Sequence, residues 1–213
     1  VYNGTGPAPE AANKDCFTKT GIPILGPLST STPGLVGGLS ALHQNHGTQS
    51  WSLLCDAAAK LADSGFFVTR AYQTFAEGNL GKLNANSVSR KIFTDNGSVP
   101  AVGTKIIQPQ LATSLRQLGD DGADGFYRGA FARLLCEDAH SSGLMLTDSD
   151  FANFRPETQT SISTTYRGFE IFQTPPNSTG FVFLQELKIL EQFDITKFDY
   201  GSTDLIHLMV EIK

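Results

Sequence analysis

One stretch, residues 166–194, constrains the fold more than any other part of the chain. It reads YRGFEIFQTPPNSTGFVFLQELKILEQFD and joins a β-rich segment, a Pro-Pro turn and a nearly all-apolar helix. A helix that is apolar on most sides needs other elements packed around it. The β-rich part begins earlier, in TSISTTYRGFEIF, where alternating polarity favours a hairpin that turns at Arg167-Gly168. The stretch therefore predicts a small β element followed by a buried helix.

The chain before this stretch begins with a predicted loop. Residues 1–31 are rich in Gly, Pro, Ser and Thr, which favours an extended segment with one short helix at Pro9–Phe17. Thr32 is predicted to cap the next helix, with Pro33 in its first position and Gly47 at its end. Three glycines weaken that helix by about 1 kcal/mol each, so they indicate close packing against another backbone. These glycines are Gly34, Gly37 and Gly38.

Helical spacing predicts most of the other elements. Asn96-Gly97 is predicted to be a turn between a short helix and a short strand, and Thr147 and Asp150 are predicted to form a capping box. The helical segments are expected near 51–64, 70–77, 110–118, 124–142 and 203–212, with Asp124 and Ser202 as caps and Gly65 and Gly143 as ends. Their predicted apolar stripes are Leu54, Ala57, Ala58 and Leu61; Leu111, Leu115 and Leu118; and Leu205, Leu208, Met209 and Ile212.

These elements place the chain in the α+β class, mostly helical with one small β element. Its 213 residues are 40% hydrophobic, which is enough for a core, and we expect residues 1–213 to form a single partial domain. The charged fraction of 17% lies below the roughly 25% of an average protein, so large surfaces should be buried against something else. The sequence starts at Val1 and stops inside a helical pattern, and we expect it to be a piece of a longer protein.

Charge, hydropathy and cysteines exclude several classes. A net charge of −5 argues against a nucleic-acid partner, which would need a basic face. No apolar run approaches the ~18–20 residues that cross a bilayer. Three cysteines without a Cys-x-x-Cys pair favour buried free thiols over a disulfide framework, and they favour a reducing compartment such as the cytoplasm over export. These cysteines are Cys16, Cys55 and Cys136.

The short motifs that could indicate a ligand-binding or metal site are weak evidence for such a site when each is taken alone. The loop GNLGKL at 78–83 lacks the spacing and the hydroxyl of a phosphate loop. His43 and His46 lie three residues apart, which suits either a metal or the dipole at a helix end, and no third ligand is identifiable. The acidic run at 120–124 favours a turn between helices over a calcium loop. The amides of residues 178–180 could hold an anion, or Asn177 or Ser178 could cap the helix.

The order of longer motifs is more specific. Six blocks follow one another along nearly the whole chain: GPLSTSTPGLVGGLSALHQNHGT, WSLLCDAAAKLADSGFFV, QPQLATSLRQLGDDGADGFYRGAFARLL, LTDSDFANF, the stretch at 166–194, and YGSTDLIHLMVEIK. In this order they resemble the large subunit of the γ-glutamyltransferase family. The PPNSTGF form, without a triple Pro, is closer to the family's acylases and amidohydrolases than to its glutathione-cleaving members.

The resemblance implies a fold, a mechanism and a partner. The fold would be the helical part of the αββα sandwich of an N-terminal-nucleophile (Ntn) hydrolase, completed by a second chain or by missing segments. A small subunit cut from the same precursor would supply an N-terminal Thr as nucleophile and its α-amino group as base. The substrate would be a small-molecule amide, and neither a metal nor an organic cofactor would be needed. The Pro-Pro turn and the helix after it would be scaffold.

The chain departs from the family at the expected carboxylate clamp. The family usually has an Arg just before the Ala-Pro of the first segment, where a bidentate pair holds the substrate's carboxylate. Here Asn3, Thr5 and Pro7 occupy the candidate positions. We therefore assign no catalytic, substrate-binding or metal-ligating residue. Two hypotheses remain, namely part of an amidohydrolase or acyltransferase and a non-catalytic relative that serves as a binding or structural protein.

Overall fold

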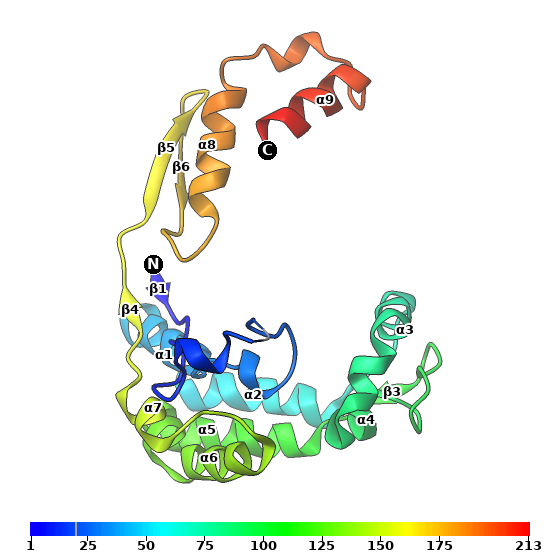
Figure 1. The fold of residues 1–213 in the computed structure, drawn as a ribbon, viewed down its shortest axis with the longest axis vertical. Coiled ribbons are helices and arrows are strands. Elements are labelled where there is room, and N and C mark those ends of the chain that lie inside the picture. The colour runs from blue at the N-terminus through cyan, green and yellow to red at the C-terminus, as the bar shows by residue number, and fades with distance from the viewer. Residues whose placement is uncertain (20) are drawn as a thin grey trace. The chain divides into compact units, whose positions relative to one another are not determined.

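The computed structural model describes residues 1–19 and 21–213, and it contains two compact units (Figure 1). One unit comprises Gly4–Arg155, and the other combines Val1–Asn3 with Pro156–Lys213. The predicted α+β composition is confirmed, since helices dominate both units and the strands form short antiparallel pairs. Whether residues 1–213 behave as the single partial domain expected from the sequence stays a prediction.

The Gly4–Arg155 unit contains most of the helices. Its elements are η1 (Lys14–Cys16), η2 (Pro27–Ser29), α1 (Leu35–His46), α2 (Trp51–Ser64), β2 (Phe66–Phe67), α3 (Arg70–Ala85), α4 (Ser87–Phe93), β3 (Lys105–Ile106), α5 (Pro109–Arg128), α6 (Ala130–Ser142) and α7 (Asp148–Asn153). The helix predicted at Pro9–Phe17 is reduced to the single turn η1, because the Asn13 side chain accepts the N–H of Asp15 and closes a short turn there. The predicted Asn96-Gly97 turn is confirmed between α4 and β3, where both residues have positive φ.

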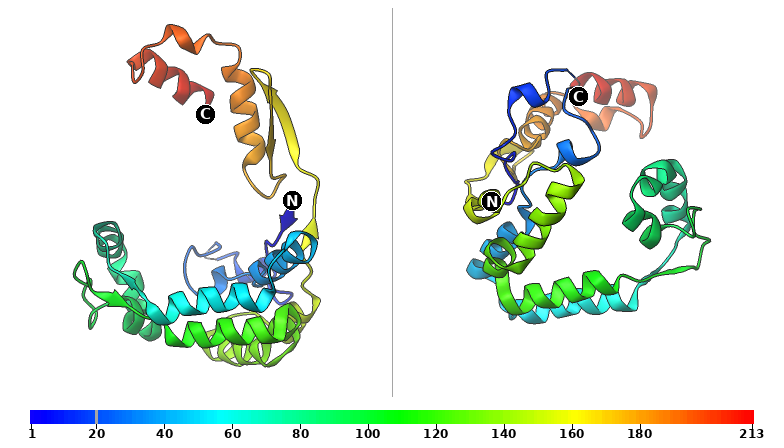
Figure 2. Two further views of the ribbon diagram at one scale, coloured as in Figure 1. Left: turned by 180° about the vertical axis from the view of Figure 1, so that it is seen from behind. Right: turned by 60° about the horizontal axis from the view of Figure 1, so that its bottom comes forward.

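Helices α2 and α5 lie side by side along the longest contact in this unit (Figure 2). Small side chains make the contact, since Ala59 and Ala112 are fully buried and Ala62 is nearly so. At the start of α2 the Trp51 indole N–H donates to the Leu118 carbonyl at 3.0 Å. Small residues at the contact let the two backbones approach closely, so neither helix can rotate without a clash.

This packing corrects the predicted inner face of α2. Leu54 and Leu61 were expected in the core, and they are 47% and 72% exposed. The residues that face α5 are Cys55, Ala59 and Ala62. Hydrophobic periodicity favoured the face with the larger side chains, whereas the contact with α5 requires the face with the smaller ones. Leu54 and Leu61 therefore form an apolar stripe on α2, as predicted, but no described residue covers that stripe.

A second core lies where α5, α6 and α7 meet. Its buried residues are Tyr127, Ala132, Cys136, Ala139, Leu146, Phe151 and Phe154. The break predicted between two helices is confirmed, since Gly122 has a positive φ of 66° and separates two helical stretches of α5, and it lies two residues before the predicted cap Asp124. A second break, at Gly129, divides the helix predicted over 124–142 and separates α5 from α6. The end of α6 at a left-handed Gly143 and the capping box of Thr147 and Asp150 are both confirmed.

The second unit contains two strand pairs. One joins strands far apart in the sequence, and the other is a hairpin of consecutive strands. The elements of the unit are β1 (Tyr2–Asn3), β4 (Glu157–Thr158), β5 (Ile162–Tyr166), β6 (Phe169–Gln173), α8 (Gly180–Leu190), η3 (Ile195–Lys197) and α9 (Thr203–Ile212). Strand β1 pairs with β4, and β5 pairs with β6 in the hairpin predicted to turn at Arg167-Gly168. Helix α8 packs on this hairpin (Figure 1), but it is not the buried helix that its composition predicts, since Phe181, Phe183 and Ile189 are 43%, 43% and 46% exposed.

Two further details of this unit differ from the prediction. The N-cap of α8 is Thr179 with no side-chain cap, although Ser178 Oγ accepts the Gly180 N–H at 3.2 Å. Helix α9 opens at Ser202 as predicted, but Met209 in its predicted stripe is 49% exposed. Since β5 and β6 form only a two-stranded sheet, the unit has little surface against which α9 can bury that stripe. Among the described helices of the whole chain, none is both long enough and apolar enough to cross a bilayer.

The corrected face of α2 gives a direct test. Ala59→Leu should lower the free energy of unfolding by about 1–3 kcal/mol, because the added carbons overpack the contact with α5. Ala57→Leu on the same helix should change it by less than about 0.5 kcal/mol, since Ala57 is exposed. Denaturant unfolding of both variants checks this. Equal losses in the two variants would contradict the assigned face.

Candidate functional site

The candidate site is the segment Gly4–Pro9, which holds two of the three positions expected to carry a carboxylate clamp. This segment lies directly on the start of α1. A Cβ on Gly34 would lie 1.9 Å from the Gly4 carbonyl oxygen, and one on Gly38 would lie 3.0 Å from the Gly4 Cα. The predicted close packing of these two glycines against another backbone is therefore confirmed, and the partner is Gly4.

The next two residues of the segment are fixed in the same way. A Cβ on Gly6 would lie 1.5 Å from the Thr32 carbonyl oxygen, and the Thr32 N–H donates to the Pro7 carbonyl at 3.0 Å. Thr32 is 1% exposed, and its hydroxyl oxygen has no hydrogen-bond partner in the part of the chain that the structure describes. The prediction that Thr32 caps α1 is wrong. Helix α1 begins at Leu35 with Gly34 as N-cap, because the residues before it pair with the first segment instead.

Tyr127 holds the same helix start from the other side. Its hydroxyl accepts the Gly37 N–H at 3.0 Å and donates to the Pro33 carbonyl at 2.8 Å. The Tyr127 ring stacks on Phe154 with ring centres 5.1 Å apart. Burial raises the pKa of Tyr127, while the Gly37 N–H acts to lower it. Gly37 has no room for a side chain because Phe154 and Tyr127 occupy that space.

Asp150 anchors the end of the segment. Its Oδ1 accepts the Glu10 N–H at 2.8 Å, and its Oδ2 accepts the Thr147 N–H at 2.8 Å. Burial acts to raise the pKa of Asp150, but the hydrogen bonds from Glu10 and Thr147 together lower it. One carboxylate thus caps α7 and ties the first segment to it. The sequence predicted the capping box, but the bond to Glu10 joins residues too distant in sequence for a local pattern to reveal.

We call the backbone of residues 4–9, held by these contacts, the wall. The side chains at the three expected clamp positions carry no charge. Asn3 lies in β1, where it pairs with Glu157, while Thr5 and Pro7 lie in the segment just described. None of the three carries the positive charge of an Arg. A Thr hydroxyl can donate one hydrogen bond to a substrate, whereas an Arg donates two in a fixed fork.

The other motifs weighed from the sequence are structural where they are described. The GNLGKL motif lies inside α3, which excludes a phosphate loop there. His43 Nε2 lies 2.7 Å from the Gln49 carbonyl oxygen, and its ring contacts Trp51 edge-on. In residues 1–19 and 21–213, the described side chains contain no group of three His, Cys, Asp or Glu that could hold a metal ion. His207, in α9, is exposed.

The three cysteines differ in burial. Cys55 and Cys136 are buried and Cys16 is half-buried, and all three are free thiols. Burial, helped by Asp148, raises the pKa of Cys136 to about 11. A thiol needs a lowered pKa to attack a carbonyl at neutral pH, so Cys136 is a packing residue. The prediction of free thiols is confirmed for the described positions.

Comparison with known proteins assigns the family. The sequence matches the family described as Gamma-glutamyltranspeptidase over residues 1–213. The chain belongs to the gamma-glutamyltranspeptidase family. It is 33% identical over 213 residues to the Glutathione hydrolase-like YwrD proenzyme of Bacillus subtilis, covering 99% of this chain and 41% of that protein. It is 32% identical over 212 residues to the Glutathione hydrolase proenzyme of Escherichia coli, covering 96% of this chain and 37% of that protein.

Solved structures of the family share the fold. The gamma-glutamyltranspeptidase of Helicobacter pylori matches with a TM-score of 0.90 at 28% identity, covering 99% of this chain and 63% of that one. The cephalosporin acylase of Bacillus halodurans matches with a TM-score of 0.88 at 26% identity, covering 99% of this chain and 41% of that one. The predicted Ntn-hydrolase relationship is therefore confirmed. Both glutathione hydrolases and acylases match, so the acylase branch stays a prediction.

The tight contact at Gly6 makes a testable feature of the wall. Gly6→Ala should lower the free energy of unfolding of the Gly4–Arg155 unit by at least about 1 kcal/mol, because a Cβ would overlap the Thr32 carbonyl. Gly78→Ala, inside α3 with no atom near the added carbon, should be neutral or stabilising by up to about 1 kcal/mol. Denaturant unfolding checks the pair, and an unchanged Gly6→Ala would rule out the described contact.

The anchor at Asp150 predicts a dependence on pH. Hydrogen bonds hold its folded pKa below the unfolded value of about 3.9. Its stabilisation is therefore present above about pH 4 and lost as the pH falls through the folded pKa. Asp150→Asn should lower the free energy of unfolding by about 1–3 kcal/mol at neutral pH, and the gap should shrink steadily below about pH 4. Unfolding curves between pH 7 and about pH 2.5 measure it, and a gap independent of pH would contradict the anchor.

Proposed function

We propose that residues 1–213 form part of the large subunit of a self-processing amidohydrolase or acyltransferase of this family. The observation that carries the proposal is the family match over the full length of the chain, shared with relatives named as proenzymes. The chain spans 41% and 37% of the lengths of those two proenzymes. A small subunit from the same precursor would complete the enzyme.

The proposed chemistry is carried by that second subunit. Its N-terminal Thr would attack the amide carbonyl carbon through Oγ, and the Thr α-amino group would take the hydroxyl proton. The amine would leave with that proton, and the acyl group would remain on Thr as an ester. Water would then release the acid, or an acceptor amine would take the acyl group. Backbone N–H groups would hold the oxyanion formed during attack. No residue of 1–213 is assigned to these steps.

The proposed contribution of this chain is a wall of the substrate pocket. The backbone at Gly4–Pro7, fixed by α1, and the neutral Thr5 side chain suit an acyl group that does not depend on an Arg for recognition. A substrate with a γ-glutamyl group would have its α-carboxylate held by other parts of the protein. Amides whose acyl part is bound mainly by shape fit this wall better, and the name of the Bacillus halodurans relative, a cephalosporin acylase, is in keeping with such substrates.

A second candidate function is a non-catalytic relative that serves as a binding or structural protein. Neutral residues at all three clamp positions, Asn3, Thr5 and Pro7, favour it. The two candidates differ in what surrounds the chain. The first expects the exposed apolar stripes of α2 and α9 to be covered by the rest of the enzyme, whereas the second expects residues 1–213 to be stable alone.

The deciding experiment is a denaturing intact mass of the native material with N-terminal sequencing of every chain found. A second chain that begins with Thr is expected and would support the processed enzyme. A single chain of 22.9 kDa would overturn it. Binding of a dye that fluoresces on apolar patches to purified residues 1–213 gives an independent check, since strong binding is expected only of a chain that lacks its cover.

A further inference from the structure

The Asn96-Gly97 turn joins α4 to β3 at one end of the Gly4–Arg155 unit (Figure 1). Asn96 has a φ of 51° and Gly97 a φ of 93°. The N–H groups of Asp95 and Ser98 each donate to the other residue's carbonyl at 2.8 Å, which closes the turn. Asn96 at its tip is exposed.

The backbone of the turn is tied to α3 and α4. Asn84 Nδ2, in α3, donates to the Gly97 carbonyl at 2.9 Å, and Arg90 Nη2, in α4, donates to the Asn96 carbonyl at 3.1 Å. The Gly97 N–H donates to Thr94 Oγ1 at 2.9 Å. The turn therefore connects the two helices through its own carbonyl and amide groups.

The Asn96 side chain is held far less firmly than the backbone. Within the part of the chain that the structure describes, its one hydrogen bond runs from Nδ2 to Asp95 Oδ1 at 3.1 Å, and that bond is exposed to solvent. The next residue, Gly97, has no Cβ that would hinder approach to its nitrogen. The side-chain amide of Asn96 can therefore turn toward the Gly97 nitrogen.

We propose that Asn96-Gly97 is a site of spontaneous covalent modification, at which Asn96 is converted through a cyclic imide to aspartate and isoaspartate. The Gly97 nitrogen gives up its proton to solvent and bonds to Asn96 Cγ, and Nδ2 leaves as ammonia. Water then opens the ring. Opening at Cγ gives aspartate, and opening at the backbone carbonyl carbon gives isoaspartate. One water is consumed and one ammonia is released, with no oxidation or reduction.

This inference is independent of the proposed function, because ring closure needs only the turn and water. It concerns one of two Asn-Gly pairs in the chain, and the other is Asn3-Gly4. The two dipeptides are chemically identical, so any difference between their reactivities comes from the structure around them.

The pair Asn3-Gly4 is held in a conformation that resists ring closure. Asn3 lies in β1 and pairs with Glu157 of β4. The Gly4 backbone lies against α1, where a Cβ on Gly34 would be 1.9 Å from the Gly4 carbonyl oxygen. The ring closes only when the Asn backbone leaves the extended conformation. At Asn3 that change would break the strand pair and the contact with α1.

The isoaspartate product would loosen the contact between α3 and α4. It lengthens the backbone between residues 96 and 97 by one carbon, which displaces the Gly97 carbonyl from Asn84. Asn84 Oδ1 is already buried without a hydrogen-bond partner among the described residues. Loss of the Nδ2 bond would leave the whole Asn84 amide unpaired, which destabilises the folded state.

Peptide mapping by mass spectrometry tests the site in the complete protein, expressed from its full reading frame and incubated in isotopically labelled water at mildly alkaline pH. Residue 96 should take up one labelled oxygen and give two products that separate by chromatography. Conversion at Asn96 should be more than about tenfold faster than at Asn3, because opening of the ordered strand adds to the barrier there.

Denaturant provides the control for the role of structure. In the unfolded protein the two Asn-Gly pairs should react at similar rates. An unmodified Asn96 in the folded protein, equal rates at the two pairs in the folded protein, or a difference that persists in denaturant would each overturn the proposal.

Asn96→Gly tests the consequence for α3 and α4. Glycine keeps the positive φ of the turn but has no side-chain amide to react. After the same incubation, amide hydrogen exchange in residues 84–97 should be several-fold faster in the modified wild-type protein and unchanged in Asn96→Gly. Equal changes in the two proteins, or no change in the modified wild type, would contradict the loosening.

Discussion

The close contact between α2 and α5 determines most of what the Gly4–Arg155 unit presents to its surroundings. Small side chains at Ala59, Ala62 and Ala112 bring the two backbones together and turn the leucines of both helices outwards. The same contact places Leu54 near Leu115 and Leu118, and these leucines line an apolar groove between α1, α2 and α5. Beyond this contact α5 has its kink at Gly122, and Asp120, Asp121 and Asp124 lie around that kink. The apolar groove and the position of the acidic residues around the kink therefore both depend on one interface built from small residues.

The wall at Gly4–Pro9 depends on a different principle, which is backbone contact without side chains. Glycines at positions 4, 6, 34 and 38 let two backbones touch, and the Tyr127 hydroxyl and the Asp150 carboxylate fix the two flanks. The shape of this backbone segment is therefore set by the core behind it.

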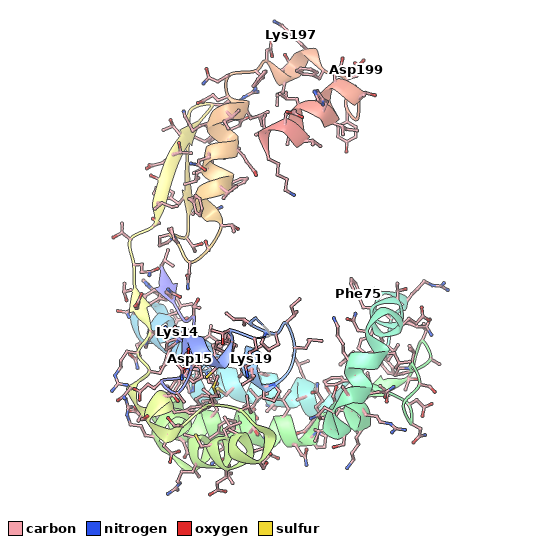
Figure 3. All side chains as sticks on the ribbon, in the orientation of Figure 1. Lys14, Asp15, Lys19, Phe75, Lys197 and Asp199 are labelled. Carbon is pink, nitrogen blue, oxygen red and sulfur yellow. The ribbon has the colours of Figure 1, made fainter. Side chains whose placement is uncertain are left out.

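Both units also leave apolar surface open. Leu54 and Leu61 of α2 in the Gly4–Arg155 unit, and Met209 of α9 in the other unit, are exposed apolar side chains. Phe75 extends this pattern, since it projects from α3 and is 75% exposed (Figure 3). Exposed apolar area on this scale marks sites of association in folded proteins. The low charged fraction of the sequence has its explanation here.

The sequence by itself determined the local elements and the family. The cap at Ser202, the hairpin turn at Arg167-Gly168 and the capping box at Thr147 follow from interactions among residues only a few positions apart, so local patterns predict them. Only the tertiary structure decided which face of α2 is buried, what the glycines of α1 contact, and that Thr32 pairs with the first segment instead of capping a helix. Those outcomes depend on contacts such as Gly37 with Tyr127 and Glu10 with Asp150. Such contacts join residues far apart in the chain, and periodicity shows that a surface is apolar but not which partner covers it.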